Sequence, residues 1–310
     1  MRNPISVVAA ALCEDLRDAA RLARREGFAG MQLPVRSAAL NIPELSASGR
    51  REVRRILAAE NQGLVGLCMQ LEGGGLAPGA DVDRALDSVE QAMESAAGLG
   101  ARLLCVDIGA LPAPAPSPAP APPARPGIAP ARYGRIIIPE FVLPPAPAAA
   151  PAAPSDPAFV AQVDAALVEM GCRADRYSVT VALRSDLASL AAVERALKAA
   201  DCPWFGVDLD PVAILRDEWS VDEVFSRLGP LIRHVRARDA VRGAERRTRP
   251  AALGAGDVDW DRLLAYLDEA GYRGWVTVDP LDLPDRAAAA VSALARLRAG
   301  RRGSPAGGAQ

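Results

Sequence analysis

Short apolar runs alternate with longer amphipathic stretches along most of the chain. Eight runs have the length and apolar character of buried strands, and they cover residues 5–12, 29–35, 64–71, 102–109, 178–184, 205–210, 232–239 and 275–280. Each is followed by apolar residues at helical spacing, over 14–26, 48–60, 81–99, 156–172, 187–200, 221–229, 258–270 and 284–299. Eight strand-then-helix units predict a parallel sheet, and eight is the number of strands that closes a barrel.

An open, doubly wound sheet is the alternative arrangement for this alternation. Such a sheet usually carries a glycine-rich GxGxxG turn after its first strand, and the segment CEDLRDAARLARREG (13–27) contains none. We therefore predict a single α/β domain over residues 1–300 with the (β/α)8 TIM barrel architecture.

One segment interrupts the alternation after the fourth strand. Residues 111–157 contain 16 of the 27 prolines, and proline and alanine at this density favour neither helix nor strand. The segment is expected to be either a disordered surface loop or a lid over the working face, because loops after barrel strands often carry function. The basic, glycine-rich residues 301–310 are expected to be a disordered tail.

Charge and cysteine content narrow the classes of function. The formal net charge is −2, so no overall positive field attracts nucleic acid or an anionic membrane. No apolar run approaches the roughly 18 residues that a membrane span needs. The 5 cysteines form no CxxC pair, which indicates buried thiols in a reducing, cytoplasmic compartment. We expect a small-molecule ligand, and a monomer or homodimer.

Several segments of the second half carry a family resemblance. They are FGVDLDPVAIL (205–215), LGPLIRHVRARDAV (228–241), LGAGDVDWDRLLAYLDEAGYRGW (253–275) and VTVDP (276–280). With GFAGMQL (27–33) in the first half, they resemble the xylose isomerase-like TIM barrel superfamily, the sugar phosphate isomerase/epimerase group. The resemblance covers nearly all of the chain outside the proline-rich insertion.

This resemblance implies a metal site at the carboxyl-terminal ends of strands five to eight. The family typically holds a divalent ion such as Mn, Mg, Zn or Co with a glutamate, an aspartate, a histidine and a second glutamate. Such ligands leave positions open for the hydroxyl and carbonyl groups of a sugar. The two glutamates also move a proton between adjacent carbons.

Only half of that ligand set is present in this chain. The aspartate of strand six matches Asp210 in DLDP, and the last glutamate matches Asp279 in TVDP. The first glutamate matches Arg184 in VALRSD, and the histidine matches Arg236 in HVR. A polar residue that often follows the strand-six aspartate falls near Ala213.

The two arginines argue against a metal cofactor. A guanidinium has no free lone pair and repels a cation, which leaves Asp210 and Asp279 as the only metal ligands of the set, if any. We therefore expect the ion pairs Arg184–Asp210 and Arg236–Asp279 where the family holds its metal. These four residues are the catalytic candidates. The arginines are either ion-pair partners in a site that has lost its chemistry or a clamp for an anionic or sugar carboxylate group.

Other polar residues are expected near the same end of the barrel. Period-two alternation places His234, Arg236 and Arg238 on one face of strand seven, and Asp208 within reach of His234. His234 is either a general base or a hydrogen-bonded core histidine. The remaining candidates for substrate binding lie at strand ends, and they are Gln32, Glu72 and Asp107.

The sequence is compatible with two functions. The first is a sugar isomerase/epimerase-like protein that acts on or binds a small sugar or sugar acid, without the usual divalent metal. The second is a non-catalytic relative, a pseudoenzyme that binds a ligand or partner. DNA repair is disfavoured, because the apurinic-site endonucleases that share this barrel need several zinc ions held by many histidines, and this chain has 1.

Overall fold

Eight parallel strands close into a barrel in the computed structural model, which describes residues 3–112, 156–185, 189–244 and 246–300. The strand order is β1-β10-β7-β6-β5-β4-β3-β2. The barrel strands are Ile5–Val8 (β1), Gly30–Pro34 (β2), Gly63–Gln70 (β3), Leu103–Asp107 (β4), Thr180–Arg184 (β5), Phe205–Leu209 (β6), Ile232–Ala237 (β7) and Val276–Val278 (β10). All eight predicted strands are present, and the predicted barrel is confirmed.

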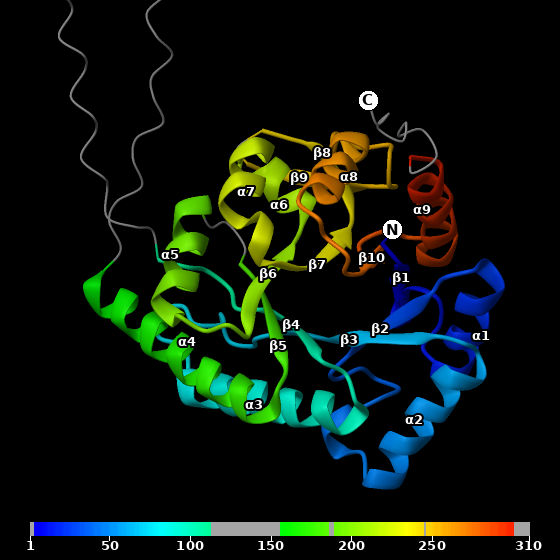
Figure 1. Cartoon of the computed structure of the whole chain (residues 1–310), viewed down its shortest axis with the longest axis horizontal. Coiled ribbons are helices and arrows are strands. Elements are labelled where there is room, and N and C mark those ends of the chain that lie inside the picture. Colours follow the sequence, from blue (N-terminus) through cyan, green and yellow to red (C-terminus); the bar gives the residue numbers. More distant parts are fainter. Residues whose placement is uncertain (1–2, 113–155, 186–188, 245, 301–310) are drawn as a thin grey trace, which may run out of the picture.

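Helices surround the barrel on the outside (Figure 1). They are Leu16–Glu26 (α1), Ala47–Ala59 (α2), Val82–Leu99 (α3), Pro157–Tyr177 (α4), Leu190–Ala200 (α5), Pro211–Arg216 (α6), Val221–Leu228 (α7), Trp260–Glu269 (α8) and Arg286–Gly300 (α9). Short 3-10 turns lie at Ala9–Ala11, Ile42–Glu44 and Gly229–Leu231. Helix starts follow local chemistry, since the side chains of Asp15, Asp81 and Ser220 accept hydrogen bonds from the first turns of α1, α3 and α7.

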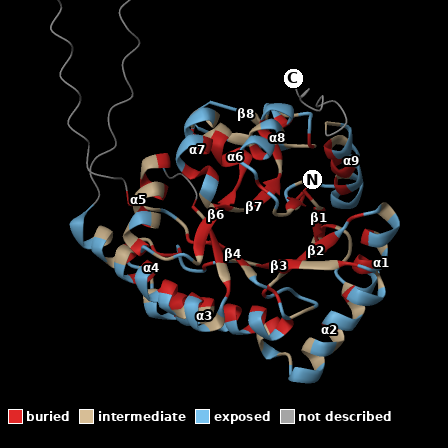
Figure 2. Cartoon of the chain, in the orientation of Figure 1, coloured by how far each residue is buried: buried red, intermediate tan, exposed pale blue. Residues whose placement is uncertain are grey.

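Two kinds of buried region are present: an apolar layer between the strands and the helices, and polar side chains along the strands. The strands and the inward faces of the helices are buried, whereas the outer helix faces are exposed (Figure 2). The shell between strands and helices is apolar, with fully buried side chains such as Leu104, Leu167 and Trp260. Polar side chains are buried along the strands, including Gln32 and His234, both 0% exposed. Because buried polar groups need partners, these residues direct attention to the interior of the barrel.

The chain departs from the predicted pattern after β7. The predicted strand 232–239 ends at Ala237, and an antiparallel hairpin follows, formed by Asp239–Arg242 (β8) and Thr248–Ala251 (β9). The carboxylate of Asp239 accepts hydrogen bonds from four backbone N–H groups, those of Ala240, Gly254, Gly256 and Val258. These contacts fix the loop that follows the hairpin, and local sequence periodicity carries no signal for them.

Two predicted segments lie largely outside the described residues. The insertion predicted at 111–157 is described only at its flanks, where the side chain of Asp156 caps α4. The predicted tail 301–310 is not described. Within the described part of the chain, no helix combines the length and apolarity needed to cross a membrane.

Candidate functional site

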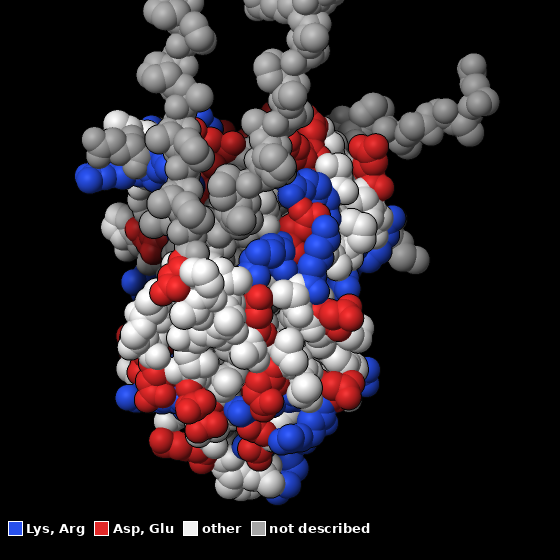
Figure 3. All heavy atoms as spheres, turned by 90° about the vertical axis from the view of Figure 1, so that its left-hand side faces the viewer, with Lys and Arg blue, Asp and Glu red and all other residues white. Residues whose placement is uncertain are grey.

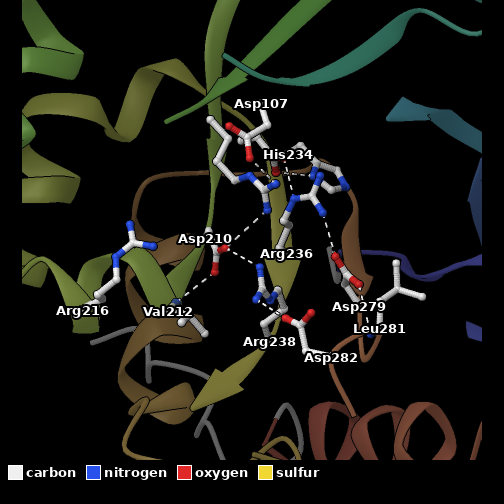
Figure 4. Close-up of polar contacts among 12 residues, drawn as sticks. Asp107, Asp210, Val212, Arg216, His234, Arg236, Arg238, Asp279, Leu281 and Asp282 are labelled. Carbon is white, nitrogen blue, oxygen red and sulfur yellow. Dashed lines mark hydrogen bonds and ion pairs between the residues drawn. The ribbon is translucent and has the colours of Figure 1, made fainter. Parts of the chain in front are cut away.

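Seven charged side chains meet at the carboxyl-terminal ends of neighbouring barrel strands. We call them the charged cluster; they are Asp107 from β4, Arg184 from β5, Asp208 and Asp210 from β6 and the turn after it, Arg236 and Arg238 from β7 and the turn after it, and Asp279 after β10. Figure 4 shows most of them pointing toward one another. The predicted catalytic residues Arg184, Asp210, Arg236 and Asp279 therefore lie at one end of the barrel.

Arg236 lies at the centre of the cluster and is 7% exposed. Its Nε donates to Oδ2 of Asp208 at 2.6 Å and its Nη1 donates to Oδ2 of Asp279 at 2.7 Å. Burial alone would lower the pKa of Arg236, but the charges of Asp208 and Asp279 raise it well above the usual value. The predicted ion pair between Arg236 and Asp279 is present, and Asp208 is an additional partner.

Arg184 is held less tightly. Its Nη2 donates to Oδ2 of Asp107 at 2.6 Å, whereas its Nη1 lies 3.7 Å from Oδ2 of Asp210, the predicted partner. The pair with Asp107 is closer because Asp107 and Arg184 are register partners on the adjacent strands β4 and β5. The Nε of Arg184 is buried and has no hydrogen-bond partner among the described residues. This guanidinium therefore retains an uncommitted donor.

Asp210 has both carboxylate oxygens engaged. Its Oδ1 accepts from the backbone N–H of Val212 at 3.0 Å, so it caps α6. Its Oδ2 accepts from Nη1 of Arg238 at 3.0 Å, and Nη2 of Arg238 donates to Asp282. Arg238, a predicted substrate-binding residue, thus connects the two carboxylates of Asp210 and Asp282 (Figure 4).

His234 lies one residue pair below Arg236 on β7 and is fully buried. Its Nδ1 lies 2.6 Å from Oδ1 of Asp208, as predicted, and its Nε2 lies 2.6 Å from Oγ1 of Thr277. Thr277 in turn contacts Oγ of Ser6 at 2.8 Å. Burial would raise the pKa of Asp208, but the charge of Arg236 and the contact with His234 hold it well below its usual value. Both ring nitrogens are partnered, so the geometry favours a core histidine.

The other two predicted substrate-binding residues lie apart from the mouth of the barrel. Gln32 is fully buried, and its Nε2 donates to Sγ of Cys105 at 3.2 Å. The side chain of Glu72 is 88% exposed and lies 3.8 Å from Arg84 in a separate surface hollow. The structure does not bring Glu72 to the charged cluster, because this residue lies in the loop after β3 with its side chain in solvent.

Sequence reasoning missed several polar residues of this region. Thr277 shares a strand face with Asp279 by period-two alternation, so that signal was available. Asp282 follows the strand in the segment DPLDLPD and carries no comparable periodic signal. The contact between Cys105 and Gln32 joins β4 to β2, which are not adjacent in the barrel.

Two hollows open next to the charged cluster. A cavity of about 220 Å³ lies between the β8–β9 hairpin and α9, and its lining includes Arg238, Asp279 and Asp282. A narrower crevice of about 30 Å³ lies beside Arg184 and is lined mainly by apolar residues and Trp219. Both reach charged side chains at the strand ends, where ligands of β/α barrels bind.

The residues present do not fit the divalent metal that the resemblance implies. Positions 184 and 236 carry guanidiniums, which offer no electron pair. Asp210 and Asp279 each accept a hydrogen bond from a guanidinium and a second from a backbone N–H. The four positions therefore form a network of ion pairs without a free ligand atom directed at a common centre.

One face of the molecule shows how surface charges are distributed. On the face in Figure 3, acidic and basic side chains are intermingled. The chain as a whole carries a formal net charge of −2. Neither observation provides the basic surface that nucleic-acid binding relies on.

Comparisons with known proteins agree with this architecture. The family model described as "Xylose isomerase-like TIM barrel" matches residues 20–299, which confirms the resemblance read from the sequence. The xylose isomerase domain protein from Planctomyces limnophilus superposes with a TM-score of 0.71 at 16% identity, covering 97% of each chain.

Two epimerase structures are similar in the same way. D-allulose 3-epimerase from Methylomonas sp., in complex with D-allulose, has a TM-score of 0.66 at 16% identity and covers 96% of this chain and 97% of its own. The 3-keto-D-glucoside 4-epimerase from E. coli has a TM-score of 0.64 at 18% identity and covers 96% of this chain and 100% of its own. At these identities the likeness shows the fold alone. No curated protein matches the sequence significantly.

Proposed function

We propose that this chain, which belongs to the xylose isomerase-like TIM barrel family, is a sugar isomerase/epimerase-like protein. In this proposal it holds a small sugar or sugar acid at the carboxyl-terminal mouth of the barrel. In this proposal no divalent ion lies at the family's metal positions, and guanidinium groups take over the binding of the ligand's oxygen atoms. The setting we propose is cytoplasmic, as a monomer or homodimer, without nucleic acid or membrane.

The observation that carries the proposal is the state of Arg184. Its guanidinium makes one short ion pair, to Asp107, and its buried Nε–H has no partner among the described residues. The side chain as a whole is 16% exposed, so a ligand at the mouth can contact it, and it reaches the buried Nε–H by displacing the side chains that cover this atom. A carbonyl, hydroxyl or carboxylate oxygen of a sugar would satisfy the uncommitted donor.

A catalytic cycle at this mouth would use the cation in place of a metal. Arg184 would donate to the carbonyl oxygen of the ligand, where negative charge develops as the adjacent carbon loses its proton. The carboxylate of Asp279 or Asp210 would take that proton and return it to the neighbouring carbon or to the opposite face. The epimerase structures of similar fold make ketoses and keto-glycosides a reasonable class of ligand.

The second candidate function is a non-catalytic ligand-binding barrel. It is favoured by one specific observation, the engagement of both candidate bases. Asp210 caps α6 and pairs with Arg238, and Asp279 pairs with the buried Arg236. Both oxygens of each carboxylate already accept a hydrogen bond from this chain's own groups, so this arrangement suits binding better than proton transfer.

The two candidates separate in an exchange experiment. The protein is incubated in heavy water with D-allulose, D-tagatose, L-ribulose and their aldose counterparts, and deuterium at the carbon next to the carbonyl is followed by NMR. Deuterium uptake supports the enzyme, whereas a ligand-dependent rise in melting temperature without uptake supports the binder. Arg184→Met should abolish the effect, and Arg249→Met, at an exposed position of β9, should not. The panel also includes the sugar acids that correspond to these aldoses, and no effect of any of these compounds on either measurement would contradict both candidates.

A gain of metal binding tests the position-by-position match to the family. The double variant Arg184→Glu with Arg236→His supplies a carboxylate and an imidazole where the family has them. We expect it to bind Mn²⁺, a hard ion suited to carboxylates, in a titration followed by electron paramagnetic resonance. The wild-type protein is expected not to bind Mn²⁺. Equal Mn²⁺ binding by both proteins would refute the assignment of these positions.

A further inference from the structure

Directly below Arg236, three side chains with metal-binding atoms converge inside the barrel. Sγ of Cys105, a carboxylate oxygen of Asp208 and a ring nitrogen of His234 all lie within 4.8 Å of one another. They come from three different strands, β4, β6 and β7, and all three residues are buried. None of them matches a metal position of the family, because those positions are 184, 210, 236 and 279.

A fourth side chain in this layer has an unsatisfied polar atom. Gln32 is 0% exposed, and its Nε2 contacts Sγ of Cys105 at 3.2 Å, whereas its Oε1 has no hydrogen-bond partner among the described residues. Exchanging the two amide atoms would leave the nitrogen without an acceptor instead. A buried amide oxygen without a partner destabilises the folded chain, so its presence beside a thiol indicates a group that would complete it.

The charges in this part of the barrel do not balance. Four carboxylates, those of Asp107, Asp208, Asp210 and Asp279, face three guanidiniums, those of Arg184, Arg236 and Arg238. These carboxylates outnumber the guanidiniums even before Asp282, which also pairs with Arg238, is counted, and an unbalanced buried charge is costly. A divalent cation bound together with a cysteine thiolate adds one net positive charge. Such a pair would therefore reduce the excess of negative charge.

We propose that this layer binds one zinc-class divalent ion through Sγ of Cys105, Oδ1 of Asp208 and Nδ1 of His234, with Oε1 of Gln32 as fourth ligand. On binding, the bond from Sγ to the ion replaces the S–H bond, and one proton is released to solvent. The ion takes the place of the hydrogen bond between Oδ1 of Asp208 and Nδ1 of His234, and the ring proton moves from Nδ1 to Nε2. Asp208 keeps its other oxygen on Nε of Arg236, and Nε2–H of His234 then donates to Thr277, which orients the ring. Four ligands of the N, O and S type suit tetrahedral Zn²⁺ or Co²⁺.

The same arginines that oppose a cation at the mouth permit one in this layer. At the mouth, two guanidiniums stand at the ligand positions 184 and 236, where they offer no electron pair. In the lower layer Arg236 donates to Asp208, and the carboxylate of Asp208 would lie between this guanidinium and the ion. The thiolate contributes a further negative charge. Without an ion, burial raises the pKa of the Cys105 thiol well above its usual value, so the cysteine is then an inert thiol.

Cobalt substitution provides the test, and it needs no sugar ligand. Because all three residues are buried, the ion is loaded during synthesis, by expressing the full chain without a histidine tag in medium supplemented with Co²⁺ or Zn²⁺. We expect one ion per chain by elemental analysis, and near-ultraviolet thiolate-to-cobalt charge-transfer absorption in the Co²⁺ form. Cys105→Ser should lose that absorption, whereas Cys172→Ser, at an exposed cysteine of α4, should retain it.

Folding defects are controlled separately. Gln32→Leu keeps the three main ligands and should weaken the retention of the ion in chelator competition by about 10- to 100-fold, with a melting curve that remains cooperative. Wild-type protein that is free of Co²⁺ and Zn²⁺ after loading would overturn the proposal, as would a Cys105→Ser variant with unchanged absorption. Mn²⁺ binding and sugar exchange report on the mouth alone, so the two proposals can fail independently.

Discussion

Replacing Arg236 by methionine tests whether buried ion pairing organises the mouth of the barrel. Methionine has nearly the same length and keeps the apolar part of the packing, but it removes the donors to Asp208 and Asp279. Both carboxylates then remain in a buried environment without their shared cation. Removing one partner of a buried ion pair costs about 3–5 kcal/mol.

The size of the expected effect follows from this burial. The side chains of Arg236, Asp208 and Asp279 are 8%, 0% and 8% exposed, so solvent screens the uncompensated charges poorly. A loss of 1 kcal/mol lowers the melting temperature of a domain of 150–250 residues by about 2–4 °C. We therefore expect the melting temperature of Arg236→Met to fall by roughly 10 °C.

The assay is urea and thermal unfolding followed by circular dichroism, with Arg249→Met as the matched control. Arg249 is exposed on β9, so its replacement should change stability by no more than about 0.5 kcal/mol. The double variant Arg236→Met with Asp279→Asn should lose less free energy of unfolding than the two single variants lose together, because it also removes a carboxylate that Arg236→Met leaves buried without a cation. The difference between the summed losses and the loss in the double variant is expected to be about 1–3 kcal/mol.

A loss below about 1 kcal/mol for Arg236→Met would refute this reasoning. It would mean that Asp208 and Asp279 are stabilised by other groups, or that Arg236 turns away from them in solution. Arg236→Lys is informative in the same series. A lysine keeps the charge but cannot donate to two carboxylates as a planar fork does, so an intermediate stability is expected.

Two further predictions concern other parts of the barrel. Gly75→Ala should destabilise the protein by about 1–3 kcal/mol more than Gly73→Ala in urea unfolding. Both glycines have positive φ, but a Cβ at Gly75 would lie 2.2 Å from the carbonyl oxygen of Ile108, whereas a Cβ at Gly73 would have nothing within 4 Å. Equal losses of stability in the two variants would contradict this packing argument. Burial raises the pKa of the Cys68 thiol to about 11, and the thiolate is the reactive form. Its alkylation should therefore rise about tenfold per pH unit between pH 8 and 10, with exposed Cys172 as the control in peptide mapping, and a rate independent of pH would show that the thiol is already ionised.

The barrel architecture could be predicted largely from the local pattern of apolar and polar residues. The alternation of eight apolar runs with eight amphipathic stretches predicted every barrel strand. This was possible because burial and the side-chain periods of strands and helices show in the pattern of neighbouring residues. The same alternation placed His234, Arg236 and Arg238 on one side of β7 and put Asp208 within reach of His234. The sequence also predicted the pair between Arg236 and Asp279, through the resemblance to the family.

Other features were decided only by tertiary structure. Asp107 is the closest carboxylate to Arg184 because β4 and β5 pair in register, and no spacing along the chain encodes that register. Gln32 meets Cys105 across the inside of the barrel, although 73 residues separate them. Partner choice among buried polar groups depends on closure of the sheet, which brings distant strand ends to one point. Local sequence therefore determined which residues are buried, whereas closure of the barrel determined which of them touch.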